Sequence, residues 1–462
     1  MINQDDQLKI SSQFGSDSDW VRRVAMPVFI AALVIKILFC LLPSDSIDMA
    51  GYKAWSMHLT LRGFDDFYQS WHVVYAPAYL YPLWLAGELA AVFSWLGTKS
   101  HEILIKVWSI FADAVGGYLI YRIGRKWNLE KTGFWLSILY LLNPAIIMNS
   151  SVWGQFESVM TVLLLAVVYC FLAEKPVPGA LLFTVAVLTK PQSALLAPLV
   201  AFLFFYRFSW RDLLLAVVGS SAMYVVIVAP FSTGRPIYWV FEHYLKSGGD
   251  YPYATANAFN LWTILGGQIV PDNQHFLGLT YALWSMVLLI GVVIFSFGPV
   301  WRNKADPFWV YYAAFLLCFG VFMVGSRMHE RYLFPAIIFL TICAIRDRKL
   351  ILPLWILSIC HFGNTLYIYL RGWLEKPQAN PILAILRQWI DQFDPGSISI
   401  WADPKDPVGL FIAWITLAVL AYCLCYPYRD LVLRLIEHWR ETRQSRTVTP
   451  NEPESIDEGA QS

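Results

Sequence analysis

The chain has 462 residues, of which 57% are hydrophobic and 16% aromatic but only 15% are charged, and its mean hydropathy is +0.51. Soluble domains carry about a quarter charged residues, so this composition excludes a set of ordinary soluble domains and indicates one polytopic, all-α membrane protein. The 34 Lys and Arg residues are nearly balanced by 33 Asp and Glu residues. This balance excludes a nucleic-acid-binding protein whose affinity depends on neutralising phosphates.

The chain begins with a polar and acidic segment, 1–23, that lacks the basic start and small-residue cleavage site of a secretory signal. We therefore expect 1–23 to be a cytoplasmic tail and the apolar run after it to remain as an anchor. The last segment, 429–462, ends in a polar stretch without aromatic residues, a composition typical of disorder. We expect a second cytoplasmic tail there, largely disordered, and one transmembrane domain over 24–428.

Long apolar runs separated by short polar clusters fill this domain. Because a spanning helix needs about 20 apolar residues, we expect about 12 transmembrane helices. Their expected positions are 24–43, 104–122, 132–149, 157–173, 178–189, 193–206, 211–230, 280–299, 307–325, 333–345, 351–370 and 408–427. Lys190-Pro191-Gln192 separates two short runs, and such a break is tolerated at membrane depth only where protein or water surrounds it. We assign Asp113, inside a predicted span, to a structural hydrogen-bond network.

One more apolar stretch, 78–97, decides the orientation of everything after it. If 78–97 crossed the membrane, the basic residues of 122–131 would lie on the side opposite Arg22 and Arg23, against the positive-inside rule. We therefore expect 78–97 to re-enter the membrane or to lie along its outer surface. Both termini are then cytoplasmic, and the sizeable outer loops are 44–103, 231–279 and 371–407.

With this threading, the polar clusters that interrupt the apolar runs all fall on the outer side. They are Asp45-Ser46-Ile47-Asp48, Trp153-Gly154-Gln155-Phe156-Glu157, Lys190-Pro191-Gln192, Asn257-Ala258-Phe259-Asn260-Leu261-Trp262 and Arg327-Met328-His329-Glu330-Arg331-Tyr332. Ionisable residues at membrane depth are costly and tend to be functional or paired. Their position at the ends of spans, rather than along the midplane, predicts an outward-facing active site and not a permeation path.

Acidic residues supply the candidate catalytic groups. Asp48 follows the first span and shares a helix face with Tyr52 and Trp55. We interpret Asp48 as a general base that takes a proton from an acceptor hydroxyl, with helix capping as the alternative, and Asp45 as the helix cap. For Glu157, capping of a helix N-terminus and a second catalytic role stay equally open.

The candidate cations are Lys190, Arg327, His329 and Arg331, which the threading places beside the outer leaflet. Arginine forks and lysine point charges suit phosphate oxygens, so we assign these residues to the phosphate of a lipid-linked donor. Ion pairing, for example of Arg331 with Glu330, and snorkelling to headgroups are the alternatives. Further side chains are assigned to contacts with a sugar or an acceptor: Tyr52, Trp55, Tyr75, Gln155, Gln192, Asn257 and Asn260.

Several of these motifs follow one another in a characteristic order. They are Asp48 with Trp55, Gly63 with Phe67-Tyr68, Tyr75-Ala76-Pro77-Ala78-Tyr79-Leu80-Tyr81, Leu142-Asn143-Pro144, Trp153-Gly154-Gln155-Phe156-Glu157, Leu188-Thr189-Lys190-Pro191-Gln192, Asn257-Ala258-Phe259-Asn260 and Met328-His329-Glu330-Arg331-Tyr332. This order resembles the GT-C superfamily, the integral membrane glycosyltransferases that use polyprenyl-phosphate sugars, and above all its bacterial-type glucosyltransferases and mannosyltransferases. The resemblance implies a GT-C-like bundle with a catalytic first outer loop.

The resemblance also implies an inverting glycosyltransferase that moves a hexose, mannose or glucose, from a polyprenyl-phosphate sugar to a lipid or glycan acceptor on the outer face. Asp48 matches the position of the family's base, and His329 and Arg331, with Lys190 as a looser match, fall on its phosphate-binding cations. Many relatives have an acidic residue and two prolines where this chain has Val74-Tyr75-Ala76-Pro77. A strict Asp-x-Asp motif is also absent, so we assign no metal and expect no cofactor.

The partners implied are the polyprenyl-phosphate sugar donor, the lipid or glycan acceptor and membrane lipids, without nucleic acid. The implied location is a bacterial inner membrane, with the active site on its extracytoplasmic side. A transporter or flippase of lipid-linked glycans is the alternative, although it needs polar residues nearer the midplane. A non-catalytic membrane scaffold whose outer loops bind a partner is a second alternative, and it leaves the Asp48, Glu157 and basic constellation without a purpose.

Overall fold

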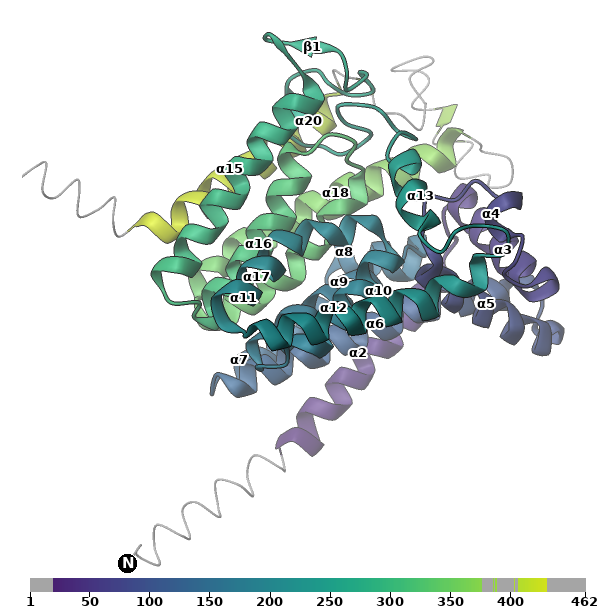
Figure 1. Cartoon of the computed structure of the whole chain (residues 1–462), viewed down its shortest axis with the longest axis horizontal. Helices are drawn as coiled ribbons and strands as arrows, with labels where there is room; N and C mark the ends of the chain where they lie inside the picture. Colours follow the sequence, from purple (N-terminus) through teal and green to yellow (C-terminus); the bar gives the residue numbers. More distant parts are fainter. Residues whose placement is uncertain (1–19, 376–384, 386, 389–402, 404–405, 430–462) are drawn as a thin grey trace, which may run out of the picture.

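The computed structural model describes residues 20–375, 385, 387–388, 403 and 406–429. The predicted tails, except for their inner ends, and most of the predicted outer loop 371–407 therefore lie outside the described residues. Apart from one small hairpin, the regular structure in the described residues is helical (Figure 1). The all-α class predicted from composition is confirmed.

The helical elements follow one another with short connections. They are η1 (Val21–Ala25), α2 (Met26–Phe39), α3 (Ser46–Arg62), α4 (Phe67–Ser70), α5 (Pro77–Val92), η2 (Ser94–Leu96), α6 (Thr98–Lys126), α7 (Glu130–Leu141), α8 (Pro144–Ile147), η3 (Met148–Trp153), α9 (Glu157–Leu172), α10 (Pro176–Thr189), η4 (Pro191–Leu196), α11 (Ala197–Arg207), α12 (Trp210–Val228), η5 (Ala229–Phe231), α13 (Trp239–Ser247), α14 (Leu261–Ile264), α15 (Tyr281–Arg302), α16 (Pro307–Val324), η6 (Glu330–Leu333), α17 (Phe334–Arg346), η7 (Arg348–Leu350), α18 (Ile351–Glu375), α20 (Pro407–Cys425) and η8 (Tyr426–Tyr428). Strands β1 (His275–Phe276) and β2 (Leu279–Thr280) form an antiparallel hairpin in which His275 pairs with Thr280.

Six helices in the described part of the chain are long and apolar enough to cross a membrane, and a bent pair brings the number to seven. The six are Lys99–Lys126, Trp210–Phe231, Tyr281–Arg302, Pro307–Val324, Arg348–Leu374 and Pro407–Tyr428, and the bent pair is Glu130–Leu141 with Pro144–Trp153. The multi-pass architecture is confirmed, whereas the expected number of about 12 spans is not. Several predicted spans fold as shorter helices, because residues such as Pro144 and Pro191 open a new helix within an apolar run.

The core of the molecule is formed around α16 and α17, whose side chains are buried on nearly every face. A helix that is apolar all round belongs in the interior of a bundle. By contrast, α12 and α15 leave rows of apolar side chains exposed, among them Val218 and Val226 on α12 and Ile290 and Ile294 on α15. These exposed rows are the surfaces that lipid would cover.

One end of the helical body carries short helices that do not cross it. Figure 1 shows α3, α4, α5 and α13 gathered there. The Asp45 carboxylate caps α3 by accepting hydrogen bonds from the backbone N–H of Ile47, at 3.1 Å, and of Asp48, at 2.9 Å, so the predicted cap is confirmed. Helix α5 occupies most of the stretch 78–97, packs against α3 and is not among the helices long enough to span.

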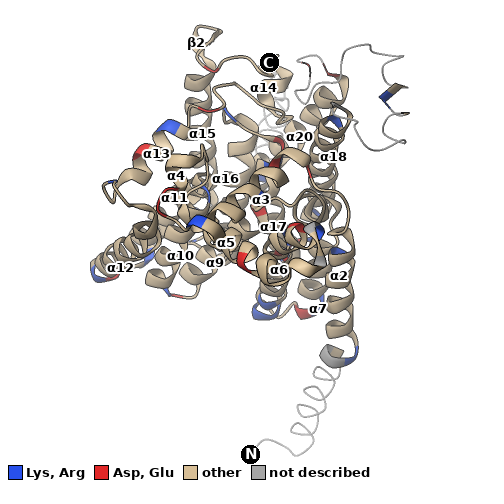
Figure 2. Ribbon diagram, turned by 90° about the vertical axis from the view of Figure 1, so that its right-hand side faces the viewer, with Lys and Arg blue, Asp and Glu red and all other residues tan. Residues whose placement is uncertain are grey.

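The opposite end carries the basic turns. Arg207 donates to the carbonyl of Ala305 at 2.8 Å, Arg302 donates to the carbonyl of Pro427 at 2.7 Å, and the Arg346 guanidinium lies over the ring of Trp127. These contacts bring turns from distant parts of the sequence to one face, and Figure 2 shows Lys and Arg at the lower ends of α2, α7 and α12. The assignment of this face to the cytoplasm stays a prediction of the positive-inside rule.

Candidate functional site

A cleft of about 480 Å³ opens where α3, η4 and η6 meet. The predicted site residues that line it are Asp48, Tyr52, Trp55, Tyr75, Lys190, Gln192, His329 and Arg331. These residues come from four separate polar or aromatic segments of the sequence. Tertiary folding has therefore brought most of the predicted constellation into one cavity.

Asp48 is held in place by donors from the segment that follows η3. Its Oδ2 atom accepts a hydrogen bond from Trp153 Nε1 at 2.9 Å and a second one from Gln155 Nε2. An Arg331 nitrogen lies 4.0 Å from the same oxygen. Tyr52, one turn further along α3, donates to Gln155 Oε1 at 3.0 Å. Asp48 is thus a well-anchored carboxylate on the cleft wall.

Gly154 makes this arrangement sterically accessible, because it ends η3 in the left-handed region with φ +88°. An added Cβ at this position would meet the Met49 side chain at 2.7 Å and the Lys106 side chain at 3.3 Å. The residues on either side of Gly154 are the two that bind Asp48. The turn therefore positions both donors.

Replacing Gly154 by alanine is expected to lower the free energy of unfolding by about 1–2 kcal/mol, the cost of a left-handed L-residue, and to loosen the Asp48 cluster. Thermal unfolding in detergent micelles measures this change. Gly291→Ala is the matched control, because Gly291 lies inside α15 with nothing within 4 Å of an added Cβ. Equal melting temperatures for Gly154→Ala and wild type would contradict the role given to this turn.

Two cations of the cleft share one buried carboxylate. Glu157 Oε1 forms an ion pair with Lys190 Nζ and lies 3.5 Å from Arg331 Nε. Glu157 is fully buried, and its second oxygen accepts no hydrogen bond from a described residue. Arg331 also donates to Glu330 Oε1 at 3.0 Å. The two cations therefore sit side by side, restrained from behind by carboxylates.

Aromatic rings frame these cations. Lys190 Nζ lies 5.3 Å from the ring centre of Tyr75 and 5.6 Å from that of Tyr332, within the range of cation–π contacts. Gln192 Nε2 bonds the Tyr332 hydroxyl at 2.8 Å. The ring of His329 meets the ring of Tyr332 edge-on at 5.3 Å. Burial, with the neighbouring cations second, lowers the pKa of His329, so its imidazole is neutral at physiological pH.

Burial raises the pKa of Glu330 to about 7, against 4.5 for an ordinary glutamate. Between these values the folded chain holds a proton that the unfolded chain has lost, so the free energy of unfolding falls as the pH rises, by about 1.4 kcal/mol per unit. Glu330→Gln is expected to remove this slope between pH 4.5 and pH 7. Unfolding midpoints across that range measure it, and Glu242→Gln, on the exposed face of α13, is the control. An unchanged slope in Glu330→Gln would contradict the assignment.

A second, apolar pocket of about 270 Å³ adjoins the cleft. The two cavities share Lys190, Pro191, Gln192 and Tyr332. The remaining wall of the apolar pocket is built by Met160, Leu195, Leu289, Val321 and Met328. Together the two cavities can hold a ligand with a charged, polyhydroxylated part and an apolar part.

Three predicted site residues lie outside the cleft, and for them the expected contact with ligand is corrected. Arg327 pairs with Asp272 at 2.6 Å. Asn260 caps α14 and donates to the carbonyl of Phe322 at 3.0 Å. Asn257 is buried and bonded to Gln268. Their side chains hold the loop around α14 in place, because buried amides are costly unless they are bonded.

Two further predicted residues, Gln155 and Glu157, contact the cleft residues from behind without lining the cavity. Sequence reasoning missed the outer rim, where His72 Nε2 lies 3.0 Å from Asp250 Oδ2 and Tyr251 joins the lining. No motif links these residues, since they come from two outer loops that meet only in the fold.

The family model described as GPI transamidase subunit PIG-U matches residues 56–319. The matched segment is more than half of the chain. The chain belongs to the PIG-U family. No curated protein sequence matches the chain closely enough to count as a relative. The PIG-U match includes α5, η3, α9 and η4, and therefore much of the cleft.

Membership of the PIG-U family overturns the prediction of a GT-C glycosyltransferase. The inverting hexosyl transfer, the polyprenyl-phosphate sugar donor and the hexosyltransferase activity are wrong with it, and the transporter or flippase alternative has no support. The bacterial inner membrane is likewise unsupported, whereas the multi-pass membrane location stands. The chemistry of the residues misled the prediction, because cations that bind a lipid-linked phosphate do not reveal which reaction the phosphate serves.

Proposed function

We propose that this PIG-U family member is a membrane subunit of a complex that attaches proteins to a lipid anchor, and that its cleft holds the phosphate-bearing part of that anchor. The family description supports the first part, since it names a subunit of GPI transamidase. GPI is a glycosylated phosphatidylinositol, which carries phosphate, sugars and apolar chains. The observation that carries the second part is the pair Lys190 and Arg331 at the junction of the polar cleft with the apolar pocket.

The cations supply the phosphate contact. Hydrogen bonds from charged donors to phosphate oxygens are short and strong, and a guanidinium can bind two oxygens at once. Arg331 is held by Glu157 and Glu330, and Lys190 by Glu157. These carboxylates keep both cations oriented in the empty cleft, and a phosphate that enters gains contacts to groups already in position.

The rest of the cleft suits the sugars and the lipid. Trp55 and Tyr75 present aromatic faces, which combine apolar area with polar edges. The apolar pocket beyond Pro191 offers space for the first part of a hydrocarbon chain. In this proposal Asp48 is a positioning residue, which keeps Trp153 and Gln155 in place and lies near Arg331.

The arrangement of the chain in the membrane belongs to the same proposal. The transmembrane domain 24–428 carries the cleft, and the segments 1–23 and 429–462 are its tails. The cleft faces the side away from the cytoplasm, opposite the basic turns. The partners of the chain are then the anchor lipid and the other protein subunits of the complex.

The test is binding of a fluorescent GPI analogue to the protein, purified with its partner subunits and reconstituted in phosphatidylcholine nanodiscs. Arg331→Gln is expected to weaken binding about 10- to 100-fold, because a hydrogen bond to a charged group contributes about 1.5–3 kcal/mol. Lys246→Gln, an exposed lysine on α13 outside the cleft, is the matched control. Unchanged binding by a folded Arg331→Gln protein would refute the assignment of the cleft, and absence of any transamidase subunit from the purified complex would refute the assembly.

A further inference from the structure

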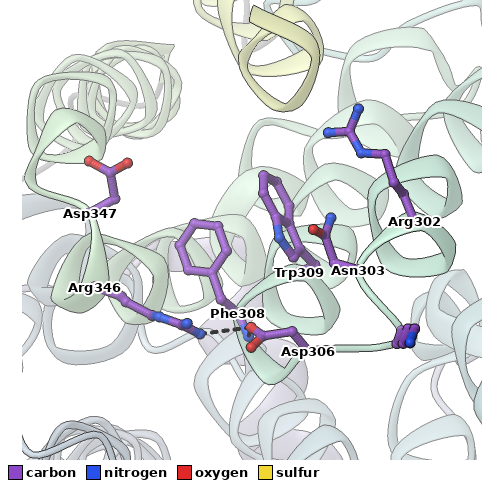
Figure 3. Close-up of a pocket in the computed structure, with 8 residues that line it drawn as sticks. Arg302, Asn303, Asp306, Phe308, Trp309, Arg346 and Asp347 are labelled. Atoms are coloured by element: carbon purple, nitrogen blue, oxygen red, sulfur yellow. Dashed lines mark hydrogen bonds and ion pairs between the residues drawn. The ribbon is translucent and has the colours of Figure 1, made fainter. Parts of the chain in front are cut away.

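A separate pocket of about 530 Å³ lies at the basic end of the molecule. It is formed by the end of α15, the turn 303–306, the start of α16 and the end of α17, as Figure 3 shows. The lining residues are Arg302, Asn303, Lys304, Asp306, Phe308, Trp309, Arg346 and Asp347. None of them lines the cleft around Arg331.

The two sites lie at opposite ends of α16. This helix runs from Pro307, beside the pocket, to Val324, shortly before His329 in the cleft. At 1.5 Å per residue its 18 residues extend about 27 Å, close to the hydrocarbon thickness of a bilayer. A ligand of the pocket therefore belongs to the other leaflet, or to the other aqueous phase.

The acidic side chains of the pocket are already engaged by the protein. Asp306 caps α16 by accepting a hydrogen bond from the backbone N–H of Phe308, and its carboxylate pairs with Arg346 at 2.7 Å. Asp347 accepts hydrogen bonds from the backbone N–H of Lys349 and from the Tyr426 hydroxyl. Both carboxylates thus have donors of their own and leave the other cations of the pocket unneutralised.

The cations are less fully used. Arg302 spends one terminal nitrogen on the carbonyl of Pro427 and has further N–H groups. The Lys304 ammonium forms no ion pair with any residue that the structure describes. Lys304 and Ala305 both adopt the left-handed region, with φ 51° and 53°, which is uncommon for residues other than glycine. Arg207 holds this turn through the carbonyl of Ala305.

The surroundings of the pocket are those of a lipid headgroup. The outer face of α15, which ends at Arg302, exposes Ile290 and Ile294, and Trp301 is 68% exposed next to the pocket. Tryptophan at the end of a span is typical of the membrane interface. An anion bound by Arg302 and Lys304 therefore sits where the phosphate of a lipid lies, with an apolar path along α15 for its chains.

We propose that this pocket binds the phosphate headgroup of an anionic phospholipid of the leaflet opposite the cleft, through Arg302 and Lys304. A free phosphate shares the headgroup chemistry but has no chain to lie along α15. The proposal goes beyond the proposed function and is independent of it, because no residue is shared between the two cavities.

The test is retention of phosphatidic acid by the full chain, released from mixed phosphatidic acid and phosphatidylcholine nanodiscs and analysed by native mass spectrometry. The wild-type protein is expected to retain phosphatidic acid in preference to phosphatidylcholine. Arg302→Gln with Lys304→Gln is expected to reduce this retention about tenfold or more, because two charge-assisted contacts are lost. Lys349→Gln, an exposed lysine at the same end but outside the pocket, should retain the lipid as wild type does.

Three outcomes would overturn the proposal. One is equal retention by the double variant and by Lys349→Gln. Another is equal loss from both, which would indicate general surface charge. The third is displacement of the lipid by millimolar inorganic phosphate alone, which would identify a site for free phosphate. Lys304→Gln alone guards against misfolding of the double variant, since Lys304 is exposed and should give an intermediate loss. Arg331→Gln should not change retention, so failure here is distinguishable from failure of the cleft.

Discussion

Replacing Lys36 by methionine is expected to lower the free energy of unfolding by about 3–5 kcal/mol, the typical cost of breaking a buried ion pair. Lys36 lies in α2 and its Nζ is 2.9 Å from Asp113 Oδ2 on α6, with neither side chain exposed. The same nitrogen donates to Ser150 Oγ at 3.1 Å. Without the lysine, Asp113 is left as an uncompensated charge inside the helical body, where its desolvation is not repaid.

Thermal unfolding of the protein in detergent micelles measures this loss. The double variant Lys36→Met with Asp113→Leu should recover most of it, because an apolar replacement of both partners leaves no buried charge. Glu174→Gln is the control for an ion pair at the surface, since Glu174 is 66% exposed in its pair with Arg207, and it should cost less than about 1 kcal/mol. A double variant as unstable as Lys36→Met would show that the loss comes from packing and not from charge.

Replacing Glu157 by glutamine is expected to strengthen anion binding in the cleft and to weaken the fold at the same time. Glu157 carries a negative charge within ion-pair distance of both Lys190 and Arg331, and this charge repels a phosphate bound to the same cations. At about 5 Å and an effective dielectric constant of about 20, the repulsion is about 3 kcal/mol. A tenfold or greater gain in affinity for the GPI analogue is therefore expected. Stability falls because Lys190 loses its ion pair.

The two effects of Glu157→Gln are measured separately, by nanodisc binding and by thermal unfolding. Glu242→Gln removes an acidic charge at an exposed position on α13 outside the cleft and should change neither quantity. Weaker binding by a folded Glu157→Gln protein would show that orientation of the cations matters more than the charge of the carboxylate. Unchanged binding would place the phosphate elsewhere.

Part of the candidate site could be predicted from residue type and order alone. The cap at Asp45 follows from its place before a helix, and the convergence of Asp48, Lys190 and Arg331 follows from alternation of spans between two faces. The separation of basic turns from the cleft follows from the same alternation. Such rules depend on the local sequence and on the bilayer, so they do not need the fold.

Other features depend on side-chain partners that are distant in the chain. Arg327 looks as suitable for a phosphate as Arg331, but only the fold places Asp272 beside it. A structural role could be assigned to Asp113, whereas its partner Lys36, about one span away, could not be named. The number of spans also failed, because prolines open new helices within apolar runs.

The sequence by itself determined the membrane class, the distribution of charge between two faces and most of the residues that gather in the cleft. It did so because hydrophobic length and charge position act on the chain directly. Only the tertiary structure decided which cations face the cleft and which are neutralised by carboxylates, and that an apolar pocket adjoins the first group. The reason is physical: the environment of a charge is set by the atoms within a few ångströms of it, and here those atoms come from the whole length of the chain.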